Sequence, residues 1–154
     1  MTDSHRFLLD ANVLVALSLP NHIHHEAAHR WLGSLDATDV WLTTGFTEAA
    51  FLRLLMNPQV VGCSVSYATA VGQLQAMKNA TRVPHEFVVD GTSLADPALP
   101  VEVLGRVVMG KAQVTDFHLL NLAAHVGARL ATFDAKLVRC LPPEWGHLIQ
   151  LINP

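Results

Sequence analysis

Four of the thirteen acidic residues stand where one predicted element gives way to the next: Asp10, Glu48, Asp116 and Asp134. Asp10 follows the apolar run 7–9 and Asp134 ends the run 129–133, whereas the other two lie in the first turns of predicted helices. Carboxylates that meet repel one another, and the hard cations Mg²⁺ and Mn²⁺ relieve that repulsion. A cation held in this way activates a water and stabilises a leaving oxygen. The chemistry that these acids predict is therefore metal-assisted hydrolysis of a phosphodiester.

Each acid also has a purely structural interpretation. Asp116 and Glu48 would complement the dipoles of their helices, and Asp134 would cap a short helix through Lys136. Asp10 lies between two apolar segments and is the hardest to explain without a cation, because a buried carboxylate needs a partner. The placement of all four acids at one edge of a sheet favours the metal site.

The elements that must position these acids alternate along the chain. Apolar runs predict strands at residues 7–9, 40–43, 86–89, 129–133 and 147–152. Helical spacing follows at 13–19, 27–35, 48–56, 66–78 and 115–126, with a loop at 59–65 and mixed signals at 91–110. This order predicts a single domain over residues 1–154, a three-layer α/β/α sandwich with a mainly parallel sheet of about five strands. The carboxyl ends of parallel strands share one edge, so the acids are expected to converge there.

Composition narrows the class of protein. Hydrophobic residues make up 51% and charged residues 15% of the chain, which excludes a disordered protein. No apolar run is long enough to cross a bilayer and the start does not resemble a secretory signal, so we expect a cytoplasmic protein away from membranes. Cys63 and Cys140 lack metal-binding spacing and are expected to be reduced. The net charge of −3 argues against nucleic-acid binding by bulk charge, but not against a nuclease that reaches phosphate through cations.

Four motifs, in this order and spacing, carry a family resemblance: LLDANVLVAL (8–17), TEAAFLRLL (47–55), TDFHLLNLAA (115–124) and ATFDAKL (131–137). The chain resembles the PIN domain and, within it, the VapC toxins of bacterial toxin–antitoxin pairs. The resemblance implies an endoribonuclease that depends on Mg²⁺ or Mn²⁺, with Asp10, Glu48, Asp116 and Asp134 as its metal site. It also implies a homodimer, a small cognate antitoxin, and structured RNA of translation, such as tRNA or a ribosomal RNA loop, as substrate.

Three polar residues are candidate supports for the acids. The resemblance places a polar residue at Asn12 to orient Asp10 or a metal-bound water, and a turn residue that caps the next helix is the alternative. Thr115 and Thr132 are candidate hydroxyl donors to the acids. A helix cap at Thr115 and an ordinary strand residue at Thr132 are the structural alternatives.

Other polar residues invite weaker hypotheses. Four of the nine histidines fall close together: His22, His24, His25 and His29. A solvent-exposed loop that enters a helix explains their polarity better than a zinc site does. Asp90, Asp96 and His118 are candidate contributors near the acids, with Asp96 as the reserve for Asp116 although its Asp–Pro pair favours a turn. Arg53 is a candidate contact for RNA phosphate or for an antitoxin acid, and a solvated helix face is the favoured alternative.

Two other functions compete with the nuclease. A non-catalytic module that binds RNA or protein on the same fold would explain the negative charge and the lack of a basic tract. Phosphoryl transfer to an aspartate, as in haloacid dehalogenase-like phosphatases, is disfavoured because their paired aspartates correspond here to Asp10 and Asn12.

Overall fold

The computed structural model describes residues 3–80, 82–100, 103, 105 and 110–154. Its centre is a five-stranded parallel sheet with the strand order β3-β2-β1-β4-β5. The strands are β1 (Arg6–Leu9), β2 (Val40–Thr43), β3 (His85–Phe87), β4 (Arg129–Thr132) and β5 (Ile149–Leu151). From β1 the chain builds outward through β2 to β3, and later builds the opposite side through β4 to β5. The carboxyl ends of β1 and β4 therefore form a topological switch point, where open α/β sheets bind ligands.

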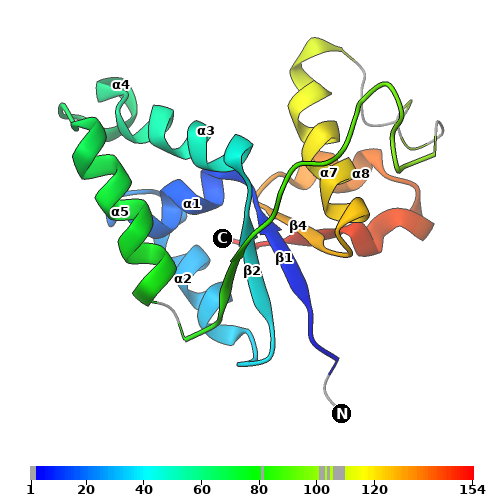
Figure 1. Ribbon diagram of the computed structural model, residues 1–154, viewed down its shortest axis with the longest axis horizontal. Coiled ribbons are helices and arrows are strands. Elements are labelled where there is room, and N and C mark those ends of the chain that lie inside the picture. The colour runs from blue at the N-terminus through cyan, green and yellow to red at the C-terminus, as the bar shows by residue number, and fades with distance from the viewer. Residues whose placement is uncertain (1–2, 81, 101–102, 104, 106–109) are drawn as a thin grey trace.

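Helices cover both faces of the sheet (Figure 1). One side carries α1 (Ala11–Ser18), α2 (His25–Ser34), α3 (Gly45–Leu55), α4 (Pro58–Val61) and α5 (Tyr67–Ala80). The other carries α7 (Val114–His125) and α8 (Ala135–Cys140), with the 3₁₀ segments η1 (Lys111–Gln113) and η2 (Pro143–Leu148). The predicted three-layer sandwich is thereby confirmed.

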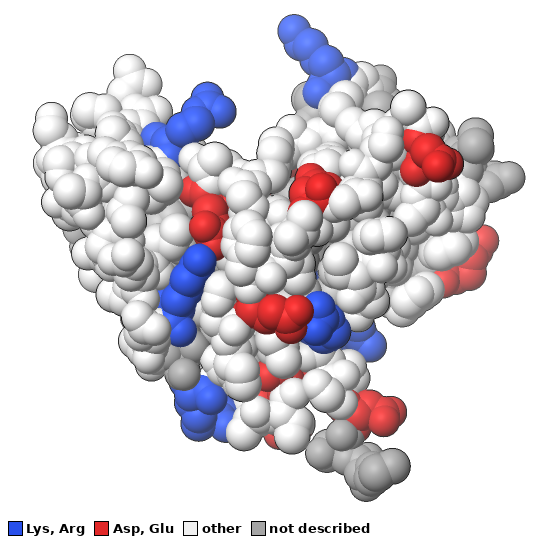
Figure 2. Space-filling model, viewed as in Figure 1, with Lys and Arg blue, Asp and Glu red and all other residues white. Residues whose placement is uncertain are grey.

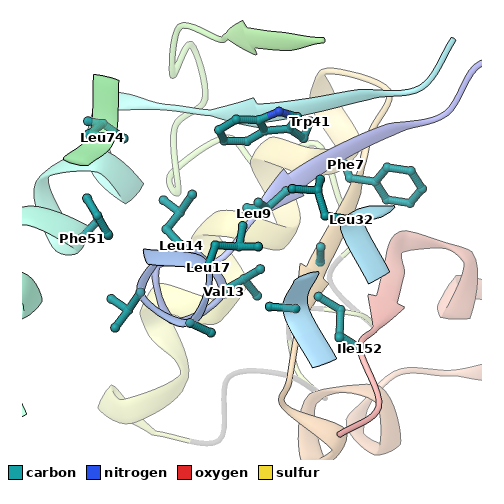
Figure 3. Close-up of a cluster of buried hydrophobic side chains, with 14 of the residues drawn as sticks. Phe7, Leu9, Val13, Leu14, Leu17, Leu32, Trp41, Phe51, Leu74 and Ile152 are labelled. Carbon is teal, nitrogen blue, oxygen red and sulfur yellow. The ribbon is translucent and has the colours of Figure 1, made fainter. Parts of the chain in front are cut away.

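Successive strand residues point to opposite faces and fill two hydrophobic cores. Phe7, Leu9 and Trp41 belong to the core beneath α1, α2, α3 and α5, part of which Figure 3 shows. Leu8 and Leu42 belong to the second core, beneath α7 and α8. Both faces of the central strands are buried, which explains why their sequences are apolar runs without polar alternation.

Several predicted boundaries differ from the structure. The predicted loop 59–65 is wrong at its start, because α4 extends to Val61. The Asn57 side chain accepts the N–H of Gln59 at 3.0 Å, and Gly62 ends the helix with a φ of 83°. Pro58 occupies the first turn, so local capping forms this short helix without an apolar stripe. The third strand ends at Phe87 rather than at residue 89, and part of the mixed segment 91–110 lies outside the described residues.

Both cysteines are free thiols, as the sequence predicts. In the portion of the chain that the structure describes, no helix combines the length and apolar character needed to cross a membrane.

Asn121 fastens the segment after β3 to α7. Its side chain is fully buried, and its Oδ1 accepts the backbone N–H groups of Ala98 at 2.7 Å and Leu99 at 3.2 Å. Replacing it with Leu removes the acceptor of both donors, so we expect Asn121→Leu to lower the free energy of unfolding by about 1–3 kcal/mol in urea titrations. The exposed Asn79→Ala is the control, expected within about 0.5 kcal/mol of wild type. Equal unfolding midpoints for the two variants would contradict this role.

Candidate active site

An open cleft of about 560 Å³ lies where β1 and β4 end. Its lining residues come from the ends of these strands, from the first turns of α1 and α7, and from the segment between α1 and α2: Asp10, Asn12, His22, Ile23, His24, Asp116, Thr132, Phe133 and Asp134. Three of the four acids singled out in the sequence therefore share one cleft.

Asp10 is held rigidly at the end of β1. Its backbone N–H donates to the carbonyl of Ala131 at 3.0 Å, which extends the pairing of β1 with β4. The Thr132 hydroxyl donates to Asp10 Oδ2 at 3.2 Å. Burial raises the pKa of the Asp10 carboxyl, and the negative charge of Asp134 raises it further, against the lowering effect of Thr132 and of the N–H groups that begin α1. Asp10 is therefore a fixed carboxylate whose charge is only partly stabilised.

Asp134 has the structural role considered from the sequence as well as a place in the cleft. Its Oδ1 caps α8 by accepting the N–H groups of Lys136 at 2.9 Å and Leu137 at 3.4 Å. Its own N–H donates to Thr132 Oγ1 at 3.2 Å, so a single hydroxyl links Asp10 to Asp134. The cap fixes the carboxylate in place without neutralising it.

Asp116 lies in the first turn of α7 and lines the same cleft. Partial burial raises the pKa of its carboxyl, and the charges of Asp10 and Asp134 raise it further. Across the described ranges, no lysine, arginine or histidine forms an ion pair with any of these three acids. The cleft thus gathers negative charge that the protein itself does not compensate.

Glu48 is placed differently from the other three acids. It lies in the first turn of α3, but it is not among the residues that line the cleft. Its Oε1 accepts a hydrogen bond from the Thr43 hydroxyl at 2.6 Å and forms an ion pair with Lys78 of α5. The Thr43 hydroxyl also contacts His85 Nε2 at 2.8 Å. Glu48 is therefore engaged by Lys78 of α5 and by Thr43 at the end of β2.

The three supporting candidates have different surroundings. Thr132 bonds to Asp10, as described above. Asn12 is exposed in the cleft, and the N-cap position of α1 belongs to Asp10, so the alternative that Asn12 caps this helix is wrong. Thr115 is exposed in α7, which begins at Val114 after the η1 turn, so the prediction that Thr115 caps this helix is also wrong.

The histidine-rich segment splits into two pairs. His25 Nδ1 contacts the carbonyl of Ala16 at 2.7 Å and His29 Nε2 contacts that of Leu17 at 2.9 Å, so these two rings tie α2 to the end of α1. Among the described residues, no three His, Cys, Asp or Glu side chains are arranged to enclose one ion, which disfavours a zinc site here. His22 and His24 instead line the acidic cleft.

The remaining candidates lie outside the cleft lining. Asp90 Oδ2 contacts His118 Nε2 at 2.5 Å, and Asp96 closes a small turn by an isolated bridge to Ser93. Arg53 is exposed on α3.

Sequence reasoning missed four residues of the cleft: His22, Ile23, His24 and Phe133. Phe133 carried a usable signal, because it stands between Thr132 and Asp134 at a strand end. The other three come from the segment between α1 and α2, and no spacing in the sequence shows that this segment turns back to the sheet edge.

Comparisons with known proteins agree with this architecture. No family model matches the chain. It is 43% identical over 132 residues to Ribonuclease VapC39 of Mycobacterium tuberculosis, covering 84% of this chain and 89% of that protein. It is 41% identical over 128 residues to Ribonuclease VapC38 of the same organism, covering 83% and 84%.

Two solved structures share the fold. The M. tuberculosis toxin VapC20, described as cleaving the sarcin–ricin loop, superimposes with a TM-score of 0.53 at 16% identity, covering 86% of this chain and 93% of that one. VapBC2 from Rickettsia felis, bound to a promoter DNA fragment, gives a TM-score of 0.58 at 13% identity, covering 96% and 98%. The identity to the curated ribonucleases extends over most of both chains. This chain therefore belongs to the VapC family of toxin ribonucleases, with the PIN fold.

Proposed function

We propose that this ribonuclease is an endonuclease that depends on Mg²⁺, with Mn²⁺ as an alternative ion, and that Asp10, Asp116 and Asp134 bind the metal. The observation that carries the proposal is the convergence of these three carboxylates, without a basic partner among the described residues, at the switch point of the sheet. Glu48 is the fourth acid of the proposal, although in the structure it pairs with Lys78 and is not among the residues that line the cleft.

The donor set fits a hard divalent cation. Carboxylate oxygens are the ligands that Mg²⁺ prefers, and Mg²⁺ is usually held by one or two carboxylates, waters and substrate phosphates rather than by a closed protein cage. Among the described residues, the three acids line one cleft but no three His, Cys, Asp or Glu side chains enclose an ion, so waters and the substrate phosphate would have to complete the coordination. Burial raises the pKa of the Asp10 and Asp116 carboxyls and the neighbouring acids raise it further, and a bound cation would oppose both effects.

When bound, the cation supplies an activated water and compensates charge on the phosphate and on the leaving oxygen. The chain's own residues hold the acids in position. Thr132 orients Asp10 and links it to Asp134, and the cap of α8 fixes Asp134. Without the cation, the three carboxylates would repel the RNA backbone. Cleavage is therefore expected to require the metal.

The substrate that we propose is structured RNA of translation, such as a tRNA or a ribosomal RNA loop, and VapC20 supports this class by its description as a sarcin–ricin loop cleaving toxin. We also propose that a small antitoxin binds this protein, and the VapBC2 structure supports such a partner. We further propose that the protein is a homodimer and is located in the cytoplasm. The free thiols agree with that location.

Metal removal tests the proposal directly. We expect the purified chain to cut RNA in Mg²⁺ or Mn²⁺, to lose all cleavage in excess EDTA, and to recover it when Mg²⁺ is restored. Gel analysis and mapping of new 5′ ends would measure these effects. Cleavage that persists in EDTA would overturn the metal mechanism, and RNA binding without cleavage in either metal would favour the binding module instead.

A further inference from the structure

The acidic cleft has a second side of different chemistry, which we call the aromatic wall: His22, Ile23, His24 and Phe133. Three of its members come from the segment between α1 and α2, and Phe133 follows β4. The wall and the carboxylates line the same 560 Å³ space, so one ligand can contact both.

The rings of the wall form a layered group. The ring centroids of His24 and Phe133 are 4.5 Å apart with an interplanar angle of 31°. His22 stacks against Phe133 with a centroid distance of 6.5 Å and an angle of 25°, and its centroid lies 5.8 Å from that of His24. All three side chains are only partly buried, so ring surface is left accessible beside the acids.

The uncharged rings and the apolar surface of the aromatic wall suit a ligand that is itself flat and uncharged. His22 Nδ1 accepts the backbone N–H of His24 at 3.0 Å, which requires an unprotonated nitrogen. Burial lowers the pKa of His22, and the charges of His24 and His25 lower it further, which agrees with a neutral ring. His24 Nδ1 is buried and has no hydrogen-bond partner among the described residues, an uncommon state for a polar atom in a native protein. Ile23, between the two rings, is 87% exposed.

The charge distribution shows why such a wall matters for RNA. Within the described part of the chain, no lysine or arginine lines the cleft, and on the face in Figure 2 the described lysines and arginines form separate patches rather than one basic surface. The described residues of this site therefore offer phosphate no basic side chain. Proteins that bind single-stranded nucleic acid add affinity by stacking bases on aromatic side chains, including histidine, and specific RNA recognition targets unstacked bases in loops.

We propose that the aromatic wall binds an unpaired RNA base by stacking, and so places the adjoining phosphate at the acids. This inference rests on the proposed function only in taking RNA as the substrate. It makes His22 and His24 binding residues rather than proton donors. It also predicts a preference for looped or single-stranded RNA over a continuous duplex, because only an unpaired base can reach the wall.

The test uses the full chain with Asp10→Asn, so that RNA is bound but not cut, and a short single-stranded RNA that contains 2-aminopurine, whose fluorescence falls when it stacks. In this background, His22→Leu removes the flat ring and is expected to weaken RNA binding about 5- to 150-fold and to reduce the quenching. His22→Phe keeps a ring of similar shape and is expected to bind like the parent. His125→Ala, an exposed histidine at the end of α7, is the control and should change neither reading.

Each outcome decides the proposal. Equal affinities for the Leu and Phe variants, or binding without quenching in the parent, would overturn it. Thermal melting identifies any variant that is unfolded, and His24→Phe repeats the comparison at the second ring. The affinity and the quenching are measured without cleavage. A failure of the stacking proposal is therefore distinguishable from a failure of the metal mechanism, which the EDTA experiment tests. In the cleaving protein, His22→Leu should raise KM and leave kcat nearly unchanged.

Discussion

The variant Asp10→Asn is expected to lose more than about a hundredfold of the wild-type rate of RNA cleavage. Removing a group that merely orients a metal ligand typically costs 10- to 100-fold, and Asp10 is proposed to be a ligand itself. The change keeps the shape of the side chain, and the amide can still accept the hydrogen bond from Thr132. The measurement is the initial rate of cleavage in saturating Mg²⁺, with Asp36→Asn, on the exposed turn after α2, as the matched control. A cleavage rate close to that of wild type would show that Asp10 is not a metal ligand.

The same variant makes a prediction about stability and pH. The folded pKa of Asp10 is raised above its ordinary value of 3.8, so the folded state binds this proton more tightly than the unfolded chain. The free energy of unfolding therefore falls as the pH rises from 3.8 through the raised pKa of the folded state. At neutral pH the ionised carboxylate destabilises the metal-free protein. We expect metal-free Asp10→Asn to melt at or above the wild-type temperature at pH 7, with the difference vanishing at pH values below 3.8.

The effect of Mg²⁺ on the melting temperature distinguishes a metal site from a cluster of acids that only repel one another. It is expected to raise the melting temperature of the wild type, because it binds the folded acids, and to have a smaller effect on Asp10→Asn. Identical Mg²⁺ responses in the two proteins would contradict metal binding at Asp10.

Phe51→Ala is expected to lower the free energy of unfolding by about 3–5 kcal/mol. Phe51 is completely buried in the core that joins α3 to α1, and the truncation leaves a cavity there that the surrounding helices cannot fill (Figure 3). Because native domains are stable by only about 5–15 kcal/mol, this is a large share of the total. Urea unfolding followed by circular dichroism measures the change.

The same helix supplies the control for Phe51. Phe46 is 42% exposed and makes an edge contact with the ring of His118, at a centroid distance of 5.3 Å. Phe46→Ala should therefore cost no more than about 1.5 kcal/mol. Comparable losses at the two positions would mean that the core beneath α3 tolerates a cavity, in conflict with its dense packing.

Some of the site was predictable because it depends on local pattern alone. Asp10 and Asp134 each follow an apolar run, and parallel strands bring such ends to a common edge whatever the details of packing. The capping role of Asp134 was also predictable, since its partners lie two and three residues away. The short helix α4 was missed although Asn57, Pro58 and Gly62 are local signals, because those residues are equally common in turns.

The sequence by itself determined the alternation of strands and helices, the three-layer class and the arrival of Asp10 and Asp134 at one rim, because burial of apolar runs and the direction of parallel strands follow from order along the chain. Only the tertiary structure decided that Glu48 pairs with Lys78, thirty residues away, and that His22 and His24 close one side of the cleft. Those contacts depend on how α3 is rotated about its axis and where the chain turns between α1 and α2. Both are set by packing between elements distant in sequence, which no spacing of residues records.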